Sequence, residues 1–451
     1  MSFDIELPAG WAWETIDTLK GAGRSVVSGP FGSNIGKRFF VEQGVPVIRG
    51  NNLSLDMKRF LDSGFVFLTE EKAAEFANCE AYADDLIFTA AGTIGQVGII
   101  PHKARYPKYI ISNKQLRARL EQTRILSLFA YYWLASPPMV ALIQSRNTGS
   151  TIPLINLSVL KSLPIPVPPL ADQQRIVDLL SVLDDRIVLL RETNATLEAI
   201  AQALFKSWFV DFDPVRAKAE GREPEGLSPD TAALFPDGFE ESELGRVPKG
   251  WAYVPFTETI KVIGGGTPKT SVSEFWGGDI PWFSVVDAPA RSDVFVLETQ
   301  KHVTALGVEN SSTKILPEGT TIISARGTVG RLALVGTEMA MNQSCYGLRG
   351  LAGDAFFTYF STSRLVEALR QRAHGSVFDT ITTETLAGVS LAYPSAQVIR
   401  VFESHVDAAM RRMKENIRQA SILASLRDIL LPRLISGQLR IPEAAEILET
   451  V

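Results

Sequence analysis

The chain has 451 residues, an ordinary globular composition and a formal net charge of -5 at pH 7, which leaves room for two or three domains. Its two cysteines, Cys79 and Cys345, lie far apart and outside any CxxC pair, so neither a disulfide framework nor a zinc site is indicated. The N-terminus has no basic region followed by an apolar run, and no apolar stretch reaches about 18 residues. We therefore expect a cytoplasmic protein and neither export nor membrane insertion.

The negative charge is concentrated in one segment. Residues 221–245 carry one Lys or Arg against seven Asp and Glu, whereas residues 1–165 carry 17 against 14 and residues 246–390 carry 13 against 13. Because Lys and Arg neutralise phosphate groups, the near-neutral remainder of the chain still permits a DNA partner. We expect a moderate salt dependence, with other subunits supplying much of the phosphate contact.

The chain contains an internal repeat. LPAGW at residues 7–11 returns as VPKGW at 247–251, and DLIFTAAGTIGQVGII at 85–100 returns as GTTIISARGTVGRLALV at 319–335. In each half, a short apolar strand that bears proline follows, and then a long helix. The offset between the copies falls from 240 to 226 residues along the chain. This pattern indicates a duplicated unit of one domain and one helix, with small deletions in the second copy.

Each half is predicted to be a mixed α/β domain. Alternating runs at residues 45–50 and 321–327 predict strands, and Gly-rich turns interrupt them. A helical pattern at residues 126–137 recurs at 355–369. The fold class is therefore α+β, with two such domains and two long helices.

In the long helices, apolar positions alternate steps of four and three, which is the seam of a coiled coil. The first seam comprises Ile176, Leu180, Leu183, Ile187, Leu190, Asn194, Leu197, Ala201, Leu204 and Trp208, and the second comprises Phe402, Val406, Ala409, Met413, Asn416, Ala420, Leu423, Arg427, Leu430 and Leu434. We expect an antiparallel, pseudo-two-fold pair of rods roughly 55 Å long. If Asn194 faces Asn416, residues whose numbers sum to about 610 should meet. One alternative is that each helix packs only on its own domain. A parallel pair is the other, but it would require the intervening domain to bring the chain back along the full rod.

The seam asparagines and the helix ends carry further signals. A buried amide in an apolar seam lowers stability but specifies register, so Asn194 and Asn416 are register candidates. Pro168 and Pro169 lie shortly before Asp172, and Pro394 lies directly before Ser395. Asp172 and Ser395 are predicted to cap the starts of the two helices, and Gly437 lies just past the end of the second.

Two matching loops are candidates for contact with a nucleic-acid backbone or groove. SGPFGSNIGKR at residues 28–38 begins 17 residues after Trp11, and GGGTPKT at 264–270 begins 13 residues after Trp251. Plain surface loops have the same composition, and both interpretations stay open. The candidate contacts are Ser33, Asn34, Lys37, Thr267 and Lys269.

The repeated GTIG (92–95) and GTVG (327–330) segments predict tight turns that need glycine at positive φ. Alternatively, these turns let backbone N–H groups approach phosphate, with Thr93, Arg326 and Thr328 nearby.

Three further segments, IRGNN, SNKQ and MNQS, place amide and basic side chains together. Asn and Gln can bind adenine, and Arg can bind guanine, through paired hydrogen bonds. Buried amides that link strands are an equally common explanation. The candidates are Arg49, Asn51, Asn113, Lys114, Gln115, Asn342 and Gln343.

The sequence offers no catalytic constellation. The phosphate-loop spacing GxxxxGK[ST] is absent, as is the [DN]PP[FY] tetrapeptide of amino-methyltransferases, and the four histidines are scattered. We therefore predict no catalytic residue, no metal and no cofactor.

FKSWFVDFDPVRAKAEG at residues 205–221, PIPVPPLADQQRIV and LLPRLISGQL, together with the duplicated plan, resemble the specificity subunit of type I restriction-modification systems. The resemblance covers essentially the whole chain. It implies target-recognition domains at 1–165 and 246–390, spacer helices at 166–215 and 391–436, an acidic linker at 216–245 and a C-terminal tail at 437–451.

The resemblance also implies a non-catalytic role. Each recognition domain would read one half of a bipartite double-stranded DNA site, and the coiled coil would set the gap. Two methyltransferase subunits and two restriction subunits would bind the chain. The alternative is a stand-alone DNA-binding regulator with two reading domains.

Overall fold

The computed structural model describes residues 6–289, 293–372, 380–440, 442–444 and 446. The chain divides into two compact units. The first unit comprises Met1–Asp185 and Ile422–Val451, and the second comprises Arg186–Ser421. Within the described ranges, no helix is both long enough and apolar enough to cross a bilayer.

The first unit is built on two four-stranded sheets with the strand orders β2-β9-β6-β7 and β4-β3-β8-β5, and a two-stranded ladder β1-β10. Short helices connect the strands. The elements are β1 (Ala12–Thr15), α1 (Ile16–Leu19), β2 (Val26–Ser28), β3 (Val45–Ile48), β4 (Val66–Leu68), α2 (Glu70–Ala74), β5 (Glu80–Ala81), β6 (Leu86–Thr89), β7 (Val97–Ile99), β8 (Tyr109–Ile111), β9 (Gln115–Ala118), α3 (Ser127–Leu134), α4 (Pro137–Ser145), α5 (Leu157–Lys161) and β10 (Pro164–Val167).

The second unit repeats most of this order of strands, but β16 extends one sheet and the other sheet has no counterpart of β5. Its sheets are β14-β21-β18-β19-β16 and β17-β15-β20, with the ladder β13-β22 and a hairpin β11-β12. The repeat and the mixed α/β character predicted from the sequence are therefore confirmed. The elements are α7 (Asp213–Ala219), α8 (Pro229–Ala233), β11 (Phe239–Ser242), β12 (Gly245–Pro248), β13 (Ala252–Pro255), β14 (Ile260–Gly264), β15 (Trp276–Phe283), β16 (Phe295–Val296), β17 (His302–Val303), α9 (Ala305–Glu309), β18 (Thr321–Ser324), β19 (Leu332–Val335), β20 (Ala340–Met341), β21 (Cys345–Gly350), α10 (Ala355–Arg372), α11 (Thr383–Ala387) and β22 (Ser390–Tyr393).

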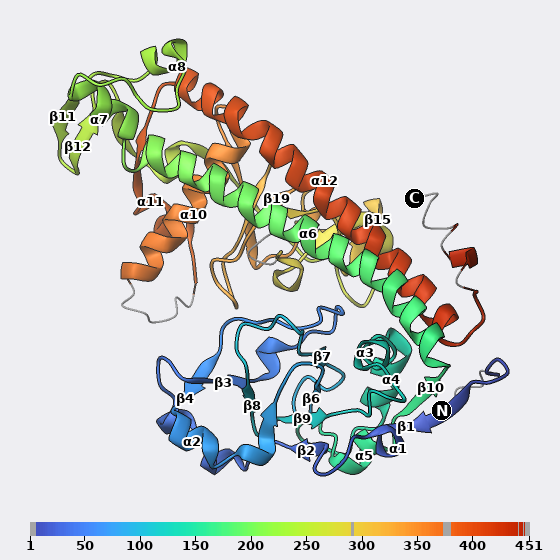
Figure 1. Ribbon diagram of the computed structural model, residues 1–451. Helices are drawn as coiled ribbons and strands as arrows, with labels where there is room; N and C mark the ends of the chain where they lie inside the picture. Colours follow the sequence, from blue (N-terminus) through green and yellow to red (C-terminus); the bar gives the residue numbers. More distant parts are fainter. Residues whose placement is uncertain (1–5, 290–292, 373–379, 441, 445, 447–451) are drawn as a thin grey trace. The chain divides into compact units, whose positions relative to one another are not determined.

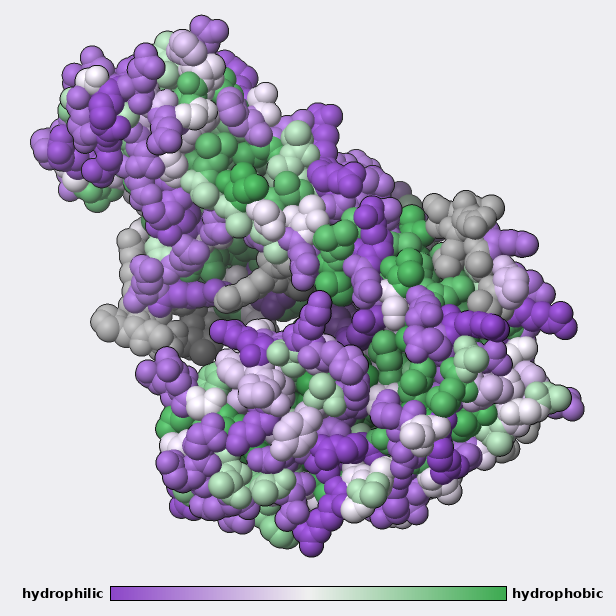
Figure 2. All heavy atoms as spheres, in the orientation of Figure 1, coloured by the Kyte–Doolittle hydropathy of each residue, from purple (hydrophilic) through white to green (hydrophobic). Residues whose placement is uncertain are grey.

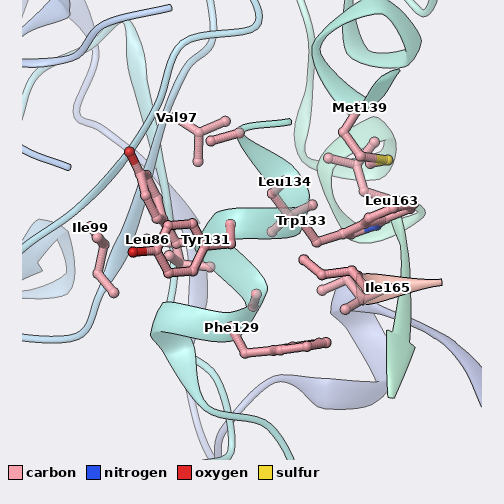
Figure 3. Packing of buried hydrophobic residues seen from close by; sticks show 14 of the residues in the cluster. Leu86, Val97, Ile99, Phe129, Tyr131, Trp133, Leu134, Met139, Leu163 and Ile165 are labelled. Carbon is pink, nitrogen blue, oxygen red and sulfur yellow. The ribbon is translucent and has the colours of Figure 1, made fainter. Parts of the chain in front are cut away.

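The core of the first unit forms around α3. Almost every side chain of this helix is buried, and Figure 3 shows Phe129, Tyr131 and Trp133 among Leu86, Ile99 and other apolar residues. The indole N–H of Trp133 donates to the carbonyl oxygen of Pro164 at 2.7 Å. The predicted helix at 126–137 is shorter than expected, because Pro137 starts the separate helix α4.

The two spacer helices, α6 (Leu170–Phe209) and α12 (Ala396–Ile435), each span 40 residues and are drawn side by side in Figure 1. The predicted seams are largely buried, and Leu180, Met413 and Phe402 are fully enclosed. In the first unit, the start of α6 packs against the end of α12 in one hydrophobic cluster. In the second unit, the end of α6 packs against the start of α12. Each unit therefore contains an antiparallel pairing.

The predicted register is confirmed by contacts inside each unit. In the second unit, Asn416 Nδ2 donates to Asn194 Oδ1 at 2.8 Å, and the rings of Trp208 and Phe402 lie 6.0 Å apart. In the first unit, Arg427 Nη1 donates to Asp184 Oδ1 at 2.8 Å. Arg427 occupies a predicted seam position because its charge is paired there, with both side chains only 5 to 6% exposed.

The helix ends match two of the three predicted caps. Ser395 Oγ accepts from the Val398 N–H at 3.4 Å before α12 begins, and Gly437 follows its end at φ +72°. Asp172 is not an N-cap, which corrects the prediction. Helix α6 already begins at Leu170, so that Asp172 lies in its first turn and faces Arg175 at 3.5 Å.

The acidic segment 216–245 contains regular structure. It includes most of α7, all of α8 and β11, and the start of β12. Lys218 Nζ donates to the Ala232 carbonyl oxygen at 3.1 Å, which joins α7 to α8. The domain boundaries given by the sequence remain predictions, and parts of the 437–451 tail lie outside the described residues.

The asparagine pair gives a first prediction. Replacing Asn416 by Leu removes the donor to Asn194 Oδ1 and leaves that oxygen buried, so we expect the free energy of unfolding to fall by about 1–3 kcal/mol. Adding Asn194→Leu removes the unpaired amide as well, and we expect the double variant to recover most of the loss. Urea unfolding measures both, and a single variant as stable as the parent would contradict the role of the pair.

A spacer carboxylate holds the start of α10 in the second unit. Glu403 Oε1 accepts from the Phe357 N–H at 2.7 Å, and Glu403 Oε2 accepts from the Phe356 N–H at 3.3 Å. Burial nevertheless raises the pKa of Glu403 to about 7 from its ordinary 4.5, because removal from water disfavours the charged form more than these donors favour it.

This raised pKa predicts a pH dependence. The folded chain binds the Glu403 proton more tightly than the unfolded chain, so this group favours folding below pH 4.5 and that contribution is lost as pH rises through about 7. We expect Glu403→Gln, which retains an acceptor oxygen, to raise stability at pH 8 relative to the parent by on the order of 1 kcal/mol. Thermal unfolding at pH 5 and 8 measures this. Glu415→Gln, on the exposed side of α12, is the control, and an equal effect of both variants would contradict the assignment.

Candidate nucleic-acid interface

In the first unit, two predicted site segments meet where parallel strands end. Strand β3 pairs parallel with β8, so the turns that follow both strands lie at the same edge. The Ser112 N–H donates to the Ile48 carbonyl oxygen at 2.9 Å. This contact places the Arg49–Asn52 turn beside the Ser112–Gln115 turn.

The loop at residues 28–38 lies against the same turn. The Gly29 N–H donates to the Gln115 carbonyl oxygen at 3.0 Å. A Cβ atom on Gly29 would lie 1.9 Å from the Ser112 carbonyl oxygen, so only glycine permits this approach. Ser33, Asn34 and Lys37 are exposed on this loop.

The GTIG turn completes the set in the first unit. The Ala90 N–H donates to the Lys114 carbonyl oxygen at 2.7 Å, and Thr93 is exposed in the turn that follows. Gly92 and Gly95 adopt φ of +95° and +98°. The need for positive φ at these glycines is thus confirmed, and a role in phosphate contact stays a prediction.

The second unit brings the equivalent segments together. Strand β15 pairs parallel with β20, and the Asn342 N–H donates to the Phe283 carbonyl oxygen at 2.9 Å. The hydroxyl of Thr267 donates to the Gln343 side chain. The Arg326 N–H donates to the Ser344 carbonyl oxygen at 3.2 Å. Five of the six predicted contacts of this unit therefore lie near one another: Thr267, Arg326, Thr328, Asn342 and Gln343. The sixth, Lys269, is exposed on the same loop as Thr267.

The exposure of these residues separates two groups. Asn51, Asn113, Lys114, Lys269, Arg326, Thr328 and Gln343 are exposed. Gln115 is only 1% exposed, and its Oε1 accepts from the Ser112 hydroxyl. Burial argues against direct contact between Gln115 and a base. Its Nε2 and the buried Nε of Arg49 have no hydrogen-bond partner among the described residues.

The structure adds two exposed apolar residues that are not among the predicted contacts. Phe31 is 83% exposed at the tip of the 28–38 loop. Val286 is 70% exposed in the second-unit turn equivalent to Arg49–Asn52. The equivalence of these turns is visible in their capping, because Asn52 accepts from the Arg49 N–H and Asp287 accepts from the Ser284 N–H. Exposed apolar side chains in such turns can contact a thymine methyl group.

The two cysteines do not resemble nucleophiles. Burial raises the pKa of Cys345 to about 12 and also raises the pKa of Cys79, so both thiols stay protonated near neutral pH. In the part of the chain that the structure describes, no group of three His, Cys, Asp or Glu residues could hold a metal ion.

The sequence matches the model of the type I restriction modification DNA specificity domain twice, over residues 37–199 and 248–408. Among curated proteins, the chain is similar to the type I restriction enzyme HindI specificity subunit of Haemophilus influenzae, with 29% identity over 377 residues, 73% of this chain and 81% of the relative. It is also similar to the putative type I restriction enzyme MjaX specificity subunit of Methanocaldococcus jannaschii, with 22% identity over 424 residues, 88% of each chain.

Two solved structures are also similar. One is the type I restriction-modification S subunit from M. genitalium, with 16% identity, a TM-score of 0.49 and coverage of 96% of this chain and 97% of that chain. The other is the HsdS subunit from Thermoanaerobacter tengcongensis, with 17% identity, a TM-score of 0.36 and coverage of 97% and 99%. The family model, which matches most of the sequence, confirms the resemblance carried by the duplicated plan. The chain therefore belongs to the type I restriction modification DNA specificity domain family.

Proposed function

We propose that this chain is the DNA specificity subunit of a type I restriction-modification complex and is not itself an enzyme. Each target-recognition domain reads one half of a bipartite double-stranded site. The observation that carries this proposal is the same convergence of exposed polar turns in both units, each at the ends of one parallel strand pair. Two equivalent DNA-contact surfaces, one in each unit, match a DNA site that has two half-sites.

The finer assignments belong to the same proposal. Recognition domains at 1–165 and 246–390 are joined by spacer helices at 166–215 and 391–436, with the segment 216–245 between the halves and the tail 437–451 after them. The antiparallel spacer sets the gap, and the seam amides Asn194 and Asn416 fix its register. Two methyltransferase and two restriction subunits bind the chain. We infer a cytoplasmic location, where the host DNA is.

The spacer surface supports binding by partner subunits. Val182 and Leu189 lie seven residues apart on α6, and Ile422 and Ile429 lie seven apart on α12, so each pair shares one side of its helix. The exposed fractions of Val182, Leu189, Ile422 and Ile429 are 66, 51, 56 and 61%. Figure 2 shows hydrophobic side chains at the surface over these helices. Exposed apolar patches commonly mark protein-binding surfaces.

A stand-alone regulator with two reading domains is the alternative, and no finding favours it. Such a regulator would bind its site tightly without partners. A chain with near-neutral recognition domains should instead need the methyltransferase subunits for affinity. A gel-shift assay of the purified chain, with and without those subunits, distinguishes the two.

The decisive experiment is to map methylated adenines in the host genome with and without this gene. We expect a two-part motif with a fixed unspecified gap that disappears when the gene is deleted. A motif that persists, or the loss of an uninterrupted motif, would overturn the proposed function.

Lengthening the spacer should change the gap. One heptad added to α6 within residues 176–208, with a matching heptad in α12, adds roughly 10 Å, or about three base pairs. We expect both half-sites to be retained and the gap between them to change by that amount. Seven residues inserted after Glu225, outside the spacer, serve as the control. An unchanged gap in the heptad variant would refute the measuring role of the spacer.

The exposed lysine of the second loop should contribute mainly to phosphate binding. We expect Lys269→Ala to weaken binding of the assembled complex to all DNA sequences alike and to lower the slope of log affinity against log salt by about 1. Lys261→Ala, on the preceding strand β14, is the control. Fluorescence anisotropy at several salt concentrations measures both. A sequence-dependent loss, or equal slopes for the two variants, would contradict this assignment.

A further inference from the structure

Arg59 links the first recognition domain to the spacer. It lies in the loop Leu53–Phe65, which we call the linking loop, between the Arg49–Asn52 turn and β4. Its Nη2 donates to the Tyr132 hydroxyl at 2.8 Å, and its Nη1 donates to Asp185 Oδ1 at 3.2 Å. Its Nε lies 3.5 Å from Asp184 Oδ2. One side chain thus contacts both α3 and α6.

Asp184 is the shared acceptor of this cluster. The Tyr132 hydroxyl donates to Asp184 Oδ2 at 2.9 Å, and Arg427 Nη1 donates to Asp184 Oδ1 at 2.8 Å. Arg427 is itself held by Asp428, whose Oδ1 accepts from the Arg427 Nε at 2.9 Å. Burial raises the pKa of Tyr132, so its hydroxyl stays protonated and can donate. Both spacer helices and the recognition domain therefore meet at one buried carboxylate.

The same linking loop is bonded to the candidate DNA-contact turn. Asn52 Nδ2 donates to the carbonyl oxygens of Leu61 and Ser63 at 3.0 and 2.9 Å. Asn51 Nδ2 donates to the Gly64 carbonyl oxygen at 3.2 Å. The Arg59 carbonyl oxygen accepts from the Ile99 N–H of β7 at 2.8 Å. The loop is thus held at one side by the turn and at the other by the spacer.

The second unit has an apolar joint at the corresponding place. The spacer helices begin 226 residues apart, so Asp184 corresponds to Met410, and Arg427 to Ala201. Tyr132 corresponds to Phe360 in the repeated helix. All three second-unit residues are buried in one hydrophobic cluster. A charged cluster is therefore not a general requirement of the repeat, and its presence in the first unit needs a separate explanation.

We propose that Arg59 is a positioning residue that fixes the DNA-contact turn of the first recognition domain relative to the spacer helices. The inference rests on the proposed function. Directional hydrogen bonds define one orientation more narrowly than an apolar contact does. Arg59 touches no DNA in this role and acts through the linking loop on Asn51 and Arg49.

The test uses the full chain in its host, with its partner subunits and with plasmids that carry the mapped site. The site has its natural gap or a gap one base pair shorter or longer. We expect Arg59→Met to reduce the preference for the natural gap roughly tenfold, with the bases of both half-sites unchanged. Tyr132→Phe, which copies the second-unit residue, should have the same effect in smaller measure. Adenine methylation at each plasmid site provides the measurement.

Lys58→Met is the matched control, because Lys58 lies on the same loop and pairs only with Asp56 in the salt bridges of the described residues, at 3.0 Å. A merely structural role would lower methylation at all three gaps equally. The ratio of methylation at the natural gap to methylation at the altered gaps would then stay unchanged. An unchanged ratio in Arg59→Met, or a change equal to that of Lys58→Met, would overturn the inference. Absence of any two-part motif with the unaltered chain would instead overturn the proposed function.

Discussion

The register of the antiparallel α6–α12 pair is set by buried polar side chains, because a buried polar group without a hydrogen-bond partner is costly. Two such pairs lie in the seam, Asn194 with Asn416 and Asp184 with Arg427. A shift of one heptad would place Asn194 opposite Leu423 or Ala409, and Asp184 opposite Leu434 or Ala420. The amide and the charge would then be buried without partners, which costs far more than an imperfect apolar contact. The polar pairs thus select one register from several that the apolar residues alone would tolerate.

Each recognition domain is attached to this pair by a polar side chain that satisfies the start of a domain helix. In the first unit, Gln173 of α6 accepts from the Leu126 N–H just before α3, at 2.8 Å. In the second unit, Glu403 of α12 accepts from the Phe357 N–H in α10, at 2.7 Å. N–H groups at the start of a helix lack an intrahelical acceptor. An amide oxygen supplies the acceptor in the first unit, and a carboxylate supplies it in the second. The two copies therefore share a plan and differ in their electrostatics.

The candidate DNA surface is a consequence of strand direction. Turns that follow parallel neighbours emerge at one edge, so β3 with β8, and β15 with β20, collect segments that are distant in sequence. Gly29 and Gly265 allow the remaining loop to approach, because a side chain at either position would collide with backbone atoms. The scaffold thereby fixes the loops and leaves positions such as Asn113 and Gln343 exposed.

The features that repeat along the chain could be predicted from the order of residues alone. Duplication, the seams, the register near a sum of 610 and the capping by Ser395 all depend on local periodicity or on identity between the halves, and periodicity is written directly in the order of residues. The N-cap predicted at Asp172 is wrong, because α6 begins directly after Pro169 and a proline can occupy the position before the first turn.

The accessibility of each candidate residue, in contrast, depends on the three-dimensional fold. Gln115 and Asn51 look alike as amides near basic residues, yet one is buried and the other exposed, since exposure depends on strand pairing over long distances. The Arg59 cluster was likewise invisible, because its members come from four segments that no local pattern connects. Long-range pairing brings them together, and it is the part of folding that sequence periodicity does not encode.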